Sequence, residues 1–160
     1  MTETAVFAAG CFWGVEQVFR DTRGVIATEV GYTGGRTQNP TYREVCGKGT
    51  GHAEAVKVEY DPAVVAYADL LEIFWASHDP TQVNRQGPDV GDQYRTAIFT
   101  LNDDQRETAL ASLAAEDASG RHARPISTKV EPLGKWWKAE ADHQQYFEKN
   151  GGGACHVPNR

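Results

Sequence analysis

The chain has 160 residues, and its 16 lysines and arginines against 22 aspartates and glutamates give a formal net charge of -6. This acidic balance, with no basic run to meet phosphates, argues against a nucleic acid or an anionic membrane surface as a partner. No apolar run approaches the roughly 18 residues that a membrane span needs, and the acidic start Met-Thr-Glu-Thr lacks the basic region of a secretion signal, so we expect a cytoplasmic protein.

The first part of the chain predicts three strands and one helix. The apolar segment 3–9 is typical of a strand, and a stretch with helical spacing follows from Cys11 onward. A second strand is predicted over 25–32, and a polar loop over 35–52 comes after its Gly-Gly turn. The segment 53–60 alternates between its two faces, as a half-buried strand does. The order to this point is therefore β-α-β-β.

The middle of the chain predicts two helices that flank one strand. Apolar residues recur at helical spacing over 67–78, which indicates an amphipathic helix packed on the sheet. A second polar loop at 79–93 precedes a strand at 94–101. An Asn–Gln capping box then predicts a helix over 102–118.

The last part predicts a short strand near 126–130, a helix over 139–149 and a tail. The core order β-α-β-β-α-β predicts an α+β fold, a two-layer sandwich of the ferredoxin-like type with added helices. We expect one catalytic domain over 1–150. The flexible glycine-rich tail at 151–160 begins with three glycines and carries Cys155.

Cys11 is the candidate nucleophile. It stands between glycines, followed by two aromatics, at a predicted strand-to-helix turn where the helix dipole favours a thiolate. The alternative is a small buried apolar side chain. A dipole contribution of roughly 0.3 to 1 kcal/mol lowers a thiol pKa by less than one unit. The substrate must therefore also be made electrophilic.

Glu54 is the candidate that activates the substrate. It lies on the strand face shared with Val56 and Val58, so burial could raise its pKa by the roughly two units that a useful general acid needs. The alternative is a solvated glutamate at a strand end. Phe12 and Trp13 could form a wall for an apolar substrate group, or they could be core residues.

The cysteines and histidines indicate neither a disulfide framework nor a metal site. The chain has three cysteines, without a CxxC pair, and its five histidines are scattered. An odd cysteine count in a cytosolic-looking chain does not predict structural disulfides, and the spacing does not fit zinc. We expect no bound metal or cofactor.

Several motifs in order along the chain carry a family resemblance. They are Gly-Cys-Phe-Trp-Gly at 10–14, Gly-Tyr-x-Gly-Gly at 31–35, Asn-Pro-Thr-Tyr at 39–42, Thr-Gly-His-Ala-Glu at 50–54, Gln-Gly-x-Asp-x-Gly-x-Gln-Tyr-Arg at 86–95 and His-Gln-Gln-Tyr at 143–146. Together they resemble the A-class peptide methionine sulfoxide reductases over nearly the whole chain. Enzymes of this class repair methionine sulfoxide.

The resemblance implies how the substrate is held. Phe12 and Trp13 would contact the methyl group of methionine sulfoxide, while Tyr42 and Tyr94 would donate hydrogen bonds to its oxygen. Asp89 matches a family position near the site and would support Cys11 or the tyrosines. The family acts on the S epimer, both free and in oxidised proteins.

The resemblance also implies the reaction. Glu54 would protonate the sulfoxide oxygen while Cys11 attacks the sulfur, which releases methionine and leaves a sulfenic acid. Cys155 would then form a disulfide with Cys11, and a thioredoxin-like partner, or dithiothreitol in vitro, would reduce it. The chain has one tail cysteine where some relatives have two, so a relay between tail cysteines is excluded. Cys46 is expected to be a bystander, and the protein a monomer.

Two other functions stay open on the residues alone. A cysteine hydrolase would pair Cys11 with His52 or His143 as general base. A binding domain would keep the aromatic pocket without catalysis. The intact set of candidate catalytic side chains argues against the second alternative.

Overall fold

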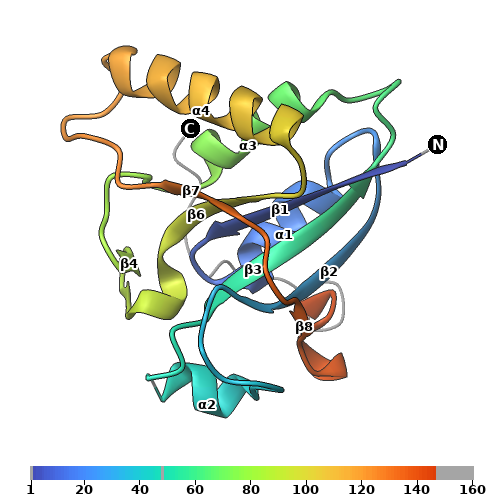
Figure 1. Cartoon of the computed structure of the whole chain (residues 1–160), viewed down its shortest axis with the longest axis vertical. Helices are drawn as coiled ribbons and strands as arrows, with labels where there is room; N and C mark the ends of the chain where they lie inside the picture. Colours follow the sequence, from blue (N-terminus) through green and yellow to red (C-terminus); the bar gives the residue numbers. More distant parts are fainter. Residues whose placement is uncertain (1, 48, 147–160) are drawn as a thin grey trace.

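The structure of the chain is a computed structural model that describes residues 2–47 and 49–146. In this part of the chain one mixed sheet is covered by helices, and Figure 1 shows helices α3 and α4 at one end of the molecule with α2 at the other. The predicted tail with Cys155 lies outside the described residues.

The main sheet has six strands in the order β7-β6-β1-β3-β2-β8. Their bounds are β1 Glu3–Ala9, β2 Val25–Thr33, β3 Ala53–Tyr60, β6 Thr96–Thr100, β7 Lys129–Pro132 and β8 Trp137–Lys138. Strands β4 (Arg85–Gln86) and β5 (Asp89–Val90) form a separate small hairpin. The prediction of a mixed helix and strand protein is thus confirmed.

Most neighbouring strands of the main sheet are antiparallel. This holds for β1 with β3 and β6, and for β2 with β3 and β8, whereas β6 and β7 are parallel. The predicted strands at 3–9, 25–32, 53–60 and 94–101 form the centre of the sheet. Strands β7 and β8 extend it on the two sides, beyond the four strands of the expected core.

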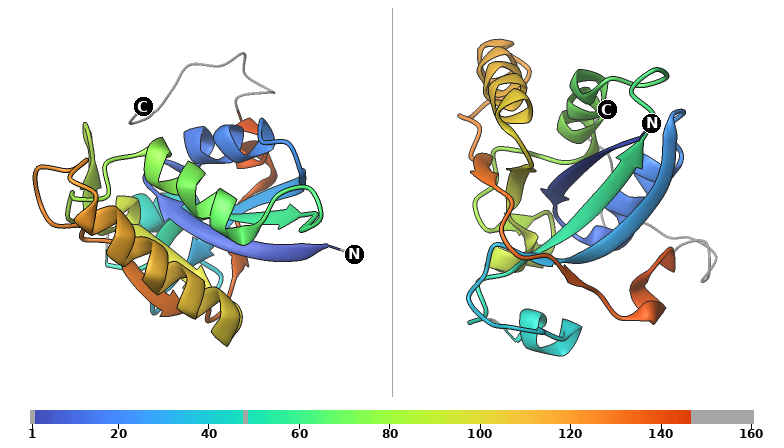
Figure 2. Two further views of the ribbon diagram at one scale, coloured as in Figure 1. Left: turned by 90° about the horizontal axis from the view of Figure 1, so that it is seen from above. Right: turned by 45° about the vertical axis from the view of Figure 1, so that its right-hand side comes forward.

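The helices are α1 (Phe12–Arg20), α2 (Tyr42–Cys46), α3 (Tyr67–Ser77) and α4 (Asp103–Ala118), with short 3-10 helices η1 (Asp92–Tyr94) and η2 (Ala141–His143). The larger core cluster joins one face of the sheet to α1, α3 and α4, since Phe19, Phe74 and Ala109 are fully buried in it. Figure 2 shows α3 and α4 lying beside each other.

The alternating segment of β3 explains how the sheet divides the core. Val56, Val58 and Tyr60 belong to the helix-covered cluster, and Ala53 and Ala55 belong to a smaller cluster on the opposite face. The alternation of side chains in a strand produces this division. The prediction that Glu54 shares a strand face with Val56 and Val58 is confirmed. This face lies on the side of the larger cluster.

The structure corrects five local predictions. In the segment predicted as a helix over 139–149, residues 141–145 form η2 and a turn instead, because Gln145 has a positive φ of 49°, which an α-helix does not accept, and among the described residues only Tyr146 is helical. The polar loop 35–52 contains helix α2, and the loop 79–93 contains the β4–β5 hairpin. The last predicted strand lies a few residues later, at Lys129–Pro132.

The fifth correction concerns the start of α4. The Asn102 side chain accepts a hydrogen bond from the backbone of Gln105 at 2.8 Å, as predicted. The Gln105 side chain, however, bonds to Leu101 and to Thr4 rather than to Asn102. The helix thus has an Asn N-cap without the reciprocal half of a capping box.

Among the described residues, none of the helices combines the length and the apolar character that crossing a bilayer requires.

Candidate active site

Cys11 lies at the turn between β1 and α1. Gly10 turns the chain with a φ of 101°, a conformation that glycine adopts without steric cost. Cys11 then stands at the N-cap position of α1 and is 6% exposed. The structure therefore places the predicted nucleophile at the positive end of a helix, which favours a thiolate in the reduced protein.

Glu54 reaches the same turn from β3. Its side chain is buried, with the residue 1% exposed, and its Oε1 accepts a hydrogen bond from the backbone N–H of Phe12 at 3.2 Å. Its Oε2 is buried and has no hydrogen-bond partner among the described residues. The Glu54 carboxyl group thus binds the residue that follows Cys11 in the sequence. Its Oε2 stays available for a further hydrogen bond.

The surroundings of Glu54 change its acidity. Burial, which disfavours the charged form, raises its pKa from 4.5 to about 8. The Phe12 N–H opposes this effect, and the nearby charge of Asp89 adds to it. Glu54 is therefore mostly protonated at neutral pH, which is the state that a proton donor requires.

Aromatic rings form a wall beside this carboxyl group. Phe12 is fully buried, and the Phe12 and Trp13 rings lie 6.1 and 6.0 Å from the ring of Tyr42. Trp13 stacks on Tyr146 at 3.9 Å, and its indole N–H donates to His143 Nδ1 at 3.0 Å. The wall thus combines α1, α2 and the segment around η2.

The segment after η2 is held by side chains that the sequence analysis did not assign. The carboxamide of Gln144 accepts from Val30 N and donates to Val30 O, both at 2.9 Å. Gln145 donates from its backbone and its side chain to buried Glu16. These bonds keep His143 and Tyr146 against Trp13.

Two tyrosines of the predicted site lie on separate short elements. Tyr42 begins α2 and Tyr94 ends η1, and burial, followed by the charge of Glu54, raises the pKa of each hydroxyl well above its ordinary value. Both hydroxyls are therefore neutral hydrogen-bond donors over the physiological range. The structure brings these side chains into the electrostatic range of Glu54.

Cys46 and Asp89 also belong to this neighbourhood. The Cys46 thiol interacts with the side chains of Tyr42 and Tyr94, and burial, as the largest cause, raises its pKa. Asp89, on β5, lies close enough for its charge to act on Glu54 and Tyr94. Cys46, which we expected to be a bystander, thus interacts with two side chains of the candidate site.

The two histidines considered as general bases are engaged elsewhere. His52 Nδ1 accepts from Gly35 N at 3.1 Å, and its Nε2 pairs with Thr37 O at 2.8 Å. His143 Nδ1 accepts from the Trp13 indole. A hydrolase dyad of Cys11 with His52 therefore finds both imidazole nitrogens already used.

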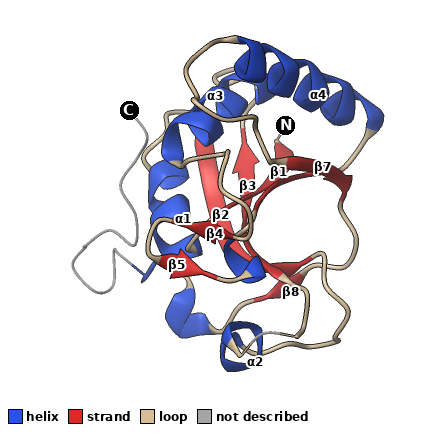
Figure 3. Ribbon diagram, turned by 90° about the vertical axis from the view of Figure 1, so that its left-hand side faces the viewer, coloured by secondary structure: helices blue, strands red, loops and turns tan. Residues whose placement is uncertain are grey.

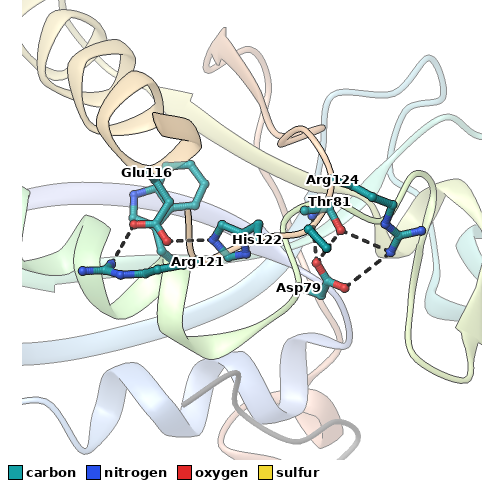
Figure 4. Close-up of a pocket in the computed structure, with 8 residues that line it drawn as sticks. Asp79, Thr81, Glu116, Arg121, His122 and Arg124 are labelled. Atoms are coloured by element: carbon teal, nitrogen blue, oxygen red, sulfur yellow. Dashed lines mark hydrogen bonds and ion pairs between the residues drawn. The ribbon is translucent and has the colours of Figure 1, made fainter. Parts of the chain in front are cut away.

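A cavity of about 520 Å³ lies apart from these residues, next to the loop that follows α4. Figure 4 shows that its charged side chains pair with one another: Glu116 with Arg121 and His122, and Asp79 with Arg124. Its polar groups satisfy each other. Among residues 2–47 and 49–146, no cluster of three or more His, Cys, Asp or Glu side chains could hold a metal ion.

Comparisons with known proteins agree with this geometry. The sequence model of the peptide methionine sulfoxide reductase family matches residues 3–160. The peptide methionine sulfoxide reductase MsrA of Geobacter sulfurreducens is 57% identical over 153 residues, which are 96% of this chain and 94% of that protein.

Solved structures give the same result. The reduced form of Mxr1 from Saccharomyces cerevisiae has a TM-score of 0.90 at 32% identity, covering 98% of this chain and 92% of that chain. Mxr1 in complex with Trx2 matches with a TM-score of 0.65 at 23% identity, over 98% of this chain and 88% of that chain.

Proposed function

This chain belongs to the peptide methionine sulfoxide reductases, oxidoreductases that reduce methionine sulfoxide, and we propose that it reduces the S epimer, free and in oxidised proteins, through thiol chemistry at Cys11. The observation that carries the proposal is the buried Glu54 carboxyl group. It bonds to the backbone N–H next to Cys11, and burial raises its pKa to about 8. The proposed proton donor thus binds the residue that follows the proposed nucleophile.

The aromatic wall and the tyrosines would bind the two ends of the sulfoxide group. The methyl group is apolar and fits against Phe12 and Trp13, whereas the oxygen is a strong acceptor and needs donors. Tyr42 and Tyr94 keep their hydroxyl protons at neutral pH and would supply them. We assign Asp89 to the support of this site, because its charge acts on Glu54 and Tyr94.

The chemical step transfers the oxygen from substrate sulfur to the enzyme. The Cys11 thiolate attacks the sulfoxide sulfur, which forms a sulfur–sulfur bond, while Glu54 donates its proton to the oxygen. That bond breaks again as the hydroxyl group moves from the substrate sulfur to the Cys11 sulfur, so methionine leaves and Cys11 becomes a sulfenic acid. The substrate is reduced by two electrons and Cys11 is oxidised by two.

Recycling requires a second thiol and an external reductant. We propose that the Cys155 thiol condenses with the sulfenic acid, which forms a Cys11–Cys155 disulfide and releases water. A thioredoxin dithiol, or dithiothreitol in vitro, then reduces the disulfide by exchange. The complex of Mxr1 with Trx2 supports a thioredoxin-type partner. No bound cofactor enters this cycle, and we propose that the monomer works in the reducing cytoplasm.

A single-turnover assay tests the proposal. The fully reduced protein is mixed with each epimer of methionine sulfoxide without reductant, and methionine and protein thiols are counted together. We expect one methionine from the S epimer and a loss of two thiols. A loss of one thiol would remove Cys155 from the resolving role. Methionine formed at the wild-type rate by Cys11→Ser would overturn the assignment of the nucleophile.

The cysteine hydrolase and the binding domain make predictions that differ from these. A hydrolase would turn over acyl or amide substrates without consuming thiols. A binding domain would take up methionine sulfoxide in a one-to-one ratio and leave every thiol intact.

A further inference from the structure

Glu140 connects two parts of the molecule that are far apart in the sequence. It follows β8 and has one hydrogen bond at each carboxylate oxygen. Oε1 accepts from the Tyr32 hydroxyl at 2.9 Å, and Oε2 accepts from the backbone N–H of Tyr42 at 2.9 Å. Although the residue is exposed, both of its oxygens are thus engaged with the protein.

One end of this bridge holds a helix that cannot be stable alone. Helix α2 has five residues, and a helix of one turn does not form without tertiary contacts. Figure 3 shows it far from α3 and α4. Thr41 and Glu44 cap it locally, and Val45 is its one buried residue in the described structure. Its first N–H, on Tyr42, has no acceptor within the helix and binds Glu140.

The other end of the bridge lies beside the proton donor. Tyr32 on β2 is fully buried and is the direct cross-strand partner of Glu54 on β3. Its ring also lies 5.7 Å from the ring of Phe12, the residue whose N–H binds Glu54. A side chain that binds the Tyr32 hydroxyl, as Glu140 does, is therefore held in a fixed position relative to Glu54.

We propose that Glu140 is a positioning residue that sets the Tyr42 hydroxyl against Glu54, so that both reach the same sulfoxide oxygen. Glu54 comes from the rigid sheet, whereas Tyr42 comes from a short helix on a polar loop. The Glu140 carboxylate joins the two through Tyr32. The inference rests on the proposed function, because it concerns how the substrate oxygen is contacted.

The ionisation of Glu140 is consistent with this role. Burial alone would raise its pKa, but the N–H of Tyr42 and the Tyr32 hydroxyl, together with the nearby His143, hold its pKa below the ordinary value. The group is therefore a carboxylate at neutral pH and can accept at both oxygens.

The test compares four variants in the single-turnover assay. Glu140→Ala removes both hydrogen bonds, and we expect a 10- to 100-fold lower rate at saturating substrate, since misplacing a reacting group by about 1 Å has this effect. Glu140→Gln can still bridge, because its oxygen accepts from Tyr42 and its amide donates to the Tyr32 oxygen. We expect this variant to stay within about threefold of the wild type.

Glu44→Ala is the matched control. Glu44 also accepts from a backbone N–H at the start of α2, that of Thr41 at 2.9 Å, and it has no bond to the sheet. We expect its rate to stay within about threefold of the wild type, because the link to Tyr32 is intact. Tyr32→Phe, which breaks only the sheet end of the bridge, should lower the rate in the same direction as Glu140→Ala.

The outcomes separate this inference from the proposed function. An inactive wild type would refute the proposed function itself. With an active wild type, equal losses in Glu140→Ala and Glu44→Ala would mean that α2 merely needs its hydrogen bonds, and the inference would fail. It would also fail if Glu140→Ala kept the wild-type rate, or if Glu140→Gln were as slow as Glu140→Ala.

Discussion

Replacing Glu54 by glutamine tests the proton donor directly. With a pKa of about 8, the carboxyl group is roughly 90% protonated at pH 7, whereas an ordinary glutamate with a pKa of 4.5 would be protonated to about 0.3%. Glutamine keeps an oxygen to accept from Phe12 N–H but cannot give up a proton. Because general acid catalysis contributes about 10²- to 10⁴-fold, we expect Glu54→Gln to lower the single-turnover rate by this factor, with little change in substrate binding.

The pH profile supplies the second half of the test. The active form is protonated, so the wild-type rate should lose this contribution as the pH rises through about 8, by tenfold per pH unit. Glu54→Gln should lack this limb, and Glu59→Gln, an exposed change on the same strand, should keep it. The reasoning would be refuted by a Glu54→Gln variant that retains the limb or reacts within threefold of the wild type.

Folding stability offers an independent check of the same group. Between pH 4.5 and about 8 the folded chain holds a proton on Glu54 that the unfolded chain has released. The unfolded state therefore binds fewer protons, and the wild type loses stability as the pH rises through this window. The pKa difference corresponds to at most roughly 5 kcal/mol. Urea titrations at both ends of the window should show this loss in the wild type and not in Glu54→Gln.

Three further changes test the resolving thiol, the oxygen contact and the packing. Cys155→Ser should form one methionine per chain without reductant, and sustained turnover with thioredoxin alone would contradict its role. Tyr42→Phe should slow a single turnover by about tenfold through loss of one hydrogen bond, whereas the control Tyr67→Phe, on α3, should not. Equal rates in the two variants would contradict the proposed hydrogen bond from Tyr42 to the sulfoxide oxygen. Gly31→Ala would place its Cβ 2.6 Å from both the Trp136 ring and the backbone oxygen of Trp137, so urea titrations should show a loss of about 1 to 3 kcal/mol in the free energy of unfolding. An unchanged free energy would mean that the segment 136–137 shifts without cost.

Local patterns were enough to predict the centre of the fold. The alternation in β3 gave the buried face of Glu54, and the helical spacing after Tyr67 gave α3 to within one residue. The Gly-Cys turn placed Cys11 at the start of α1. These features depend on neighbours in the sequence, which is why a single chain reveals them.

The rest of the site depends on contacts between distant residues. Gln144 bonds to Val30, 114 positions away, and His143 bonds to Trp13, 130 positions away. The sequence predicts a helix over 139–149, but these bonds hold residues 141–145 in η2 and a turn instead. Tertiary contacts thus override local propensity. The same reason hides the interactions of Glu140 and Cys46, which join residues far apart in the sequence.

The Gln144 carboxamide has a consequence for the solubility of the molecule. Strand β8 has only two residues, so it leaves part of the outer side of β2 without a partner strand. Gln144 fills the gap at Val30 by donating and accepting as a backbone would, and Gln145 covers the carbonyl of Thr28. Unpaired strand edges recruit other chains. The residues that support the aromatic wall therefore also cover part of this strand edge, so we expect a mutation there to increase self-association as well as to lower activity.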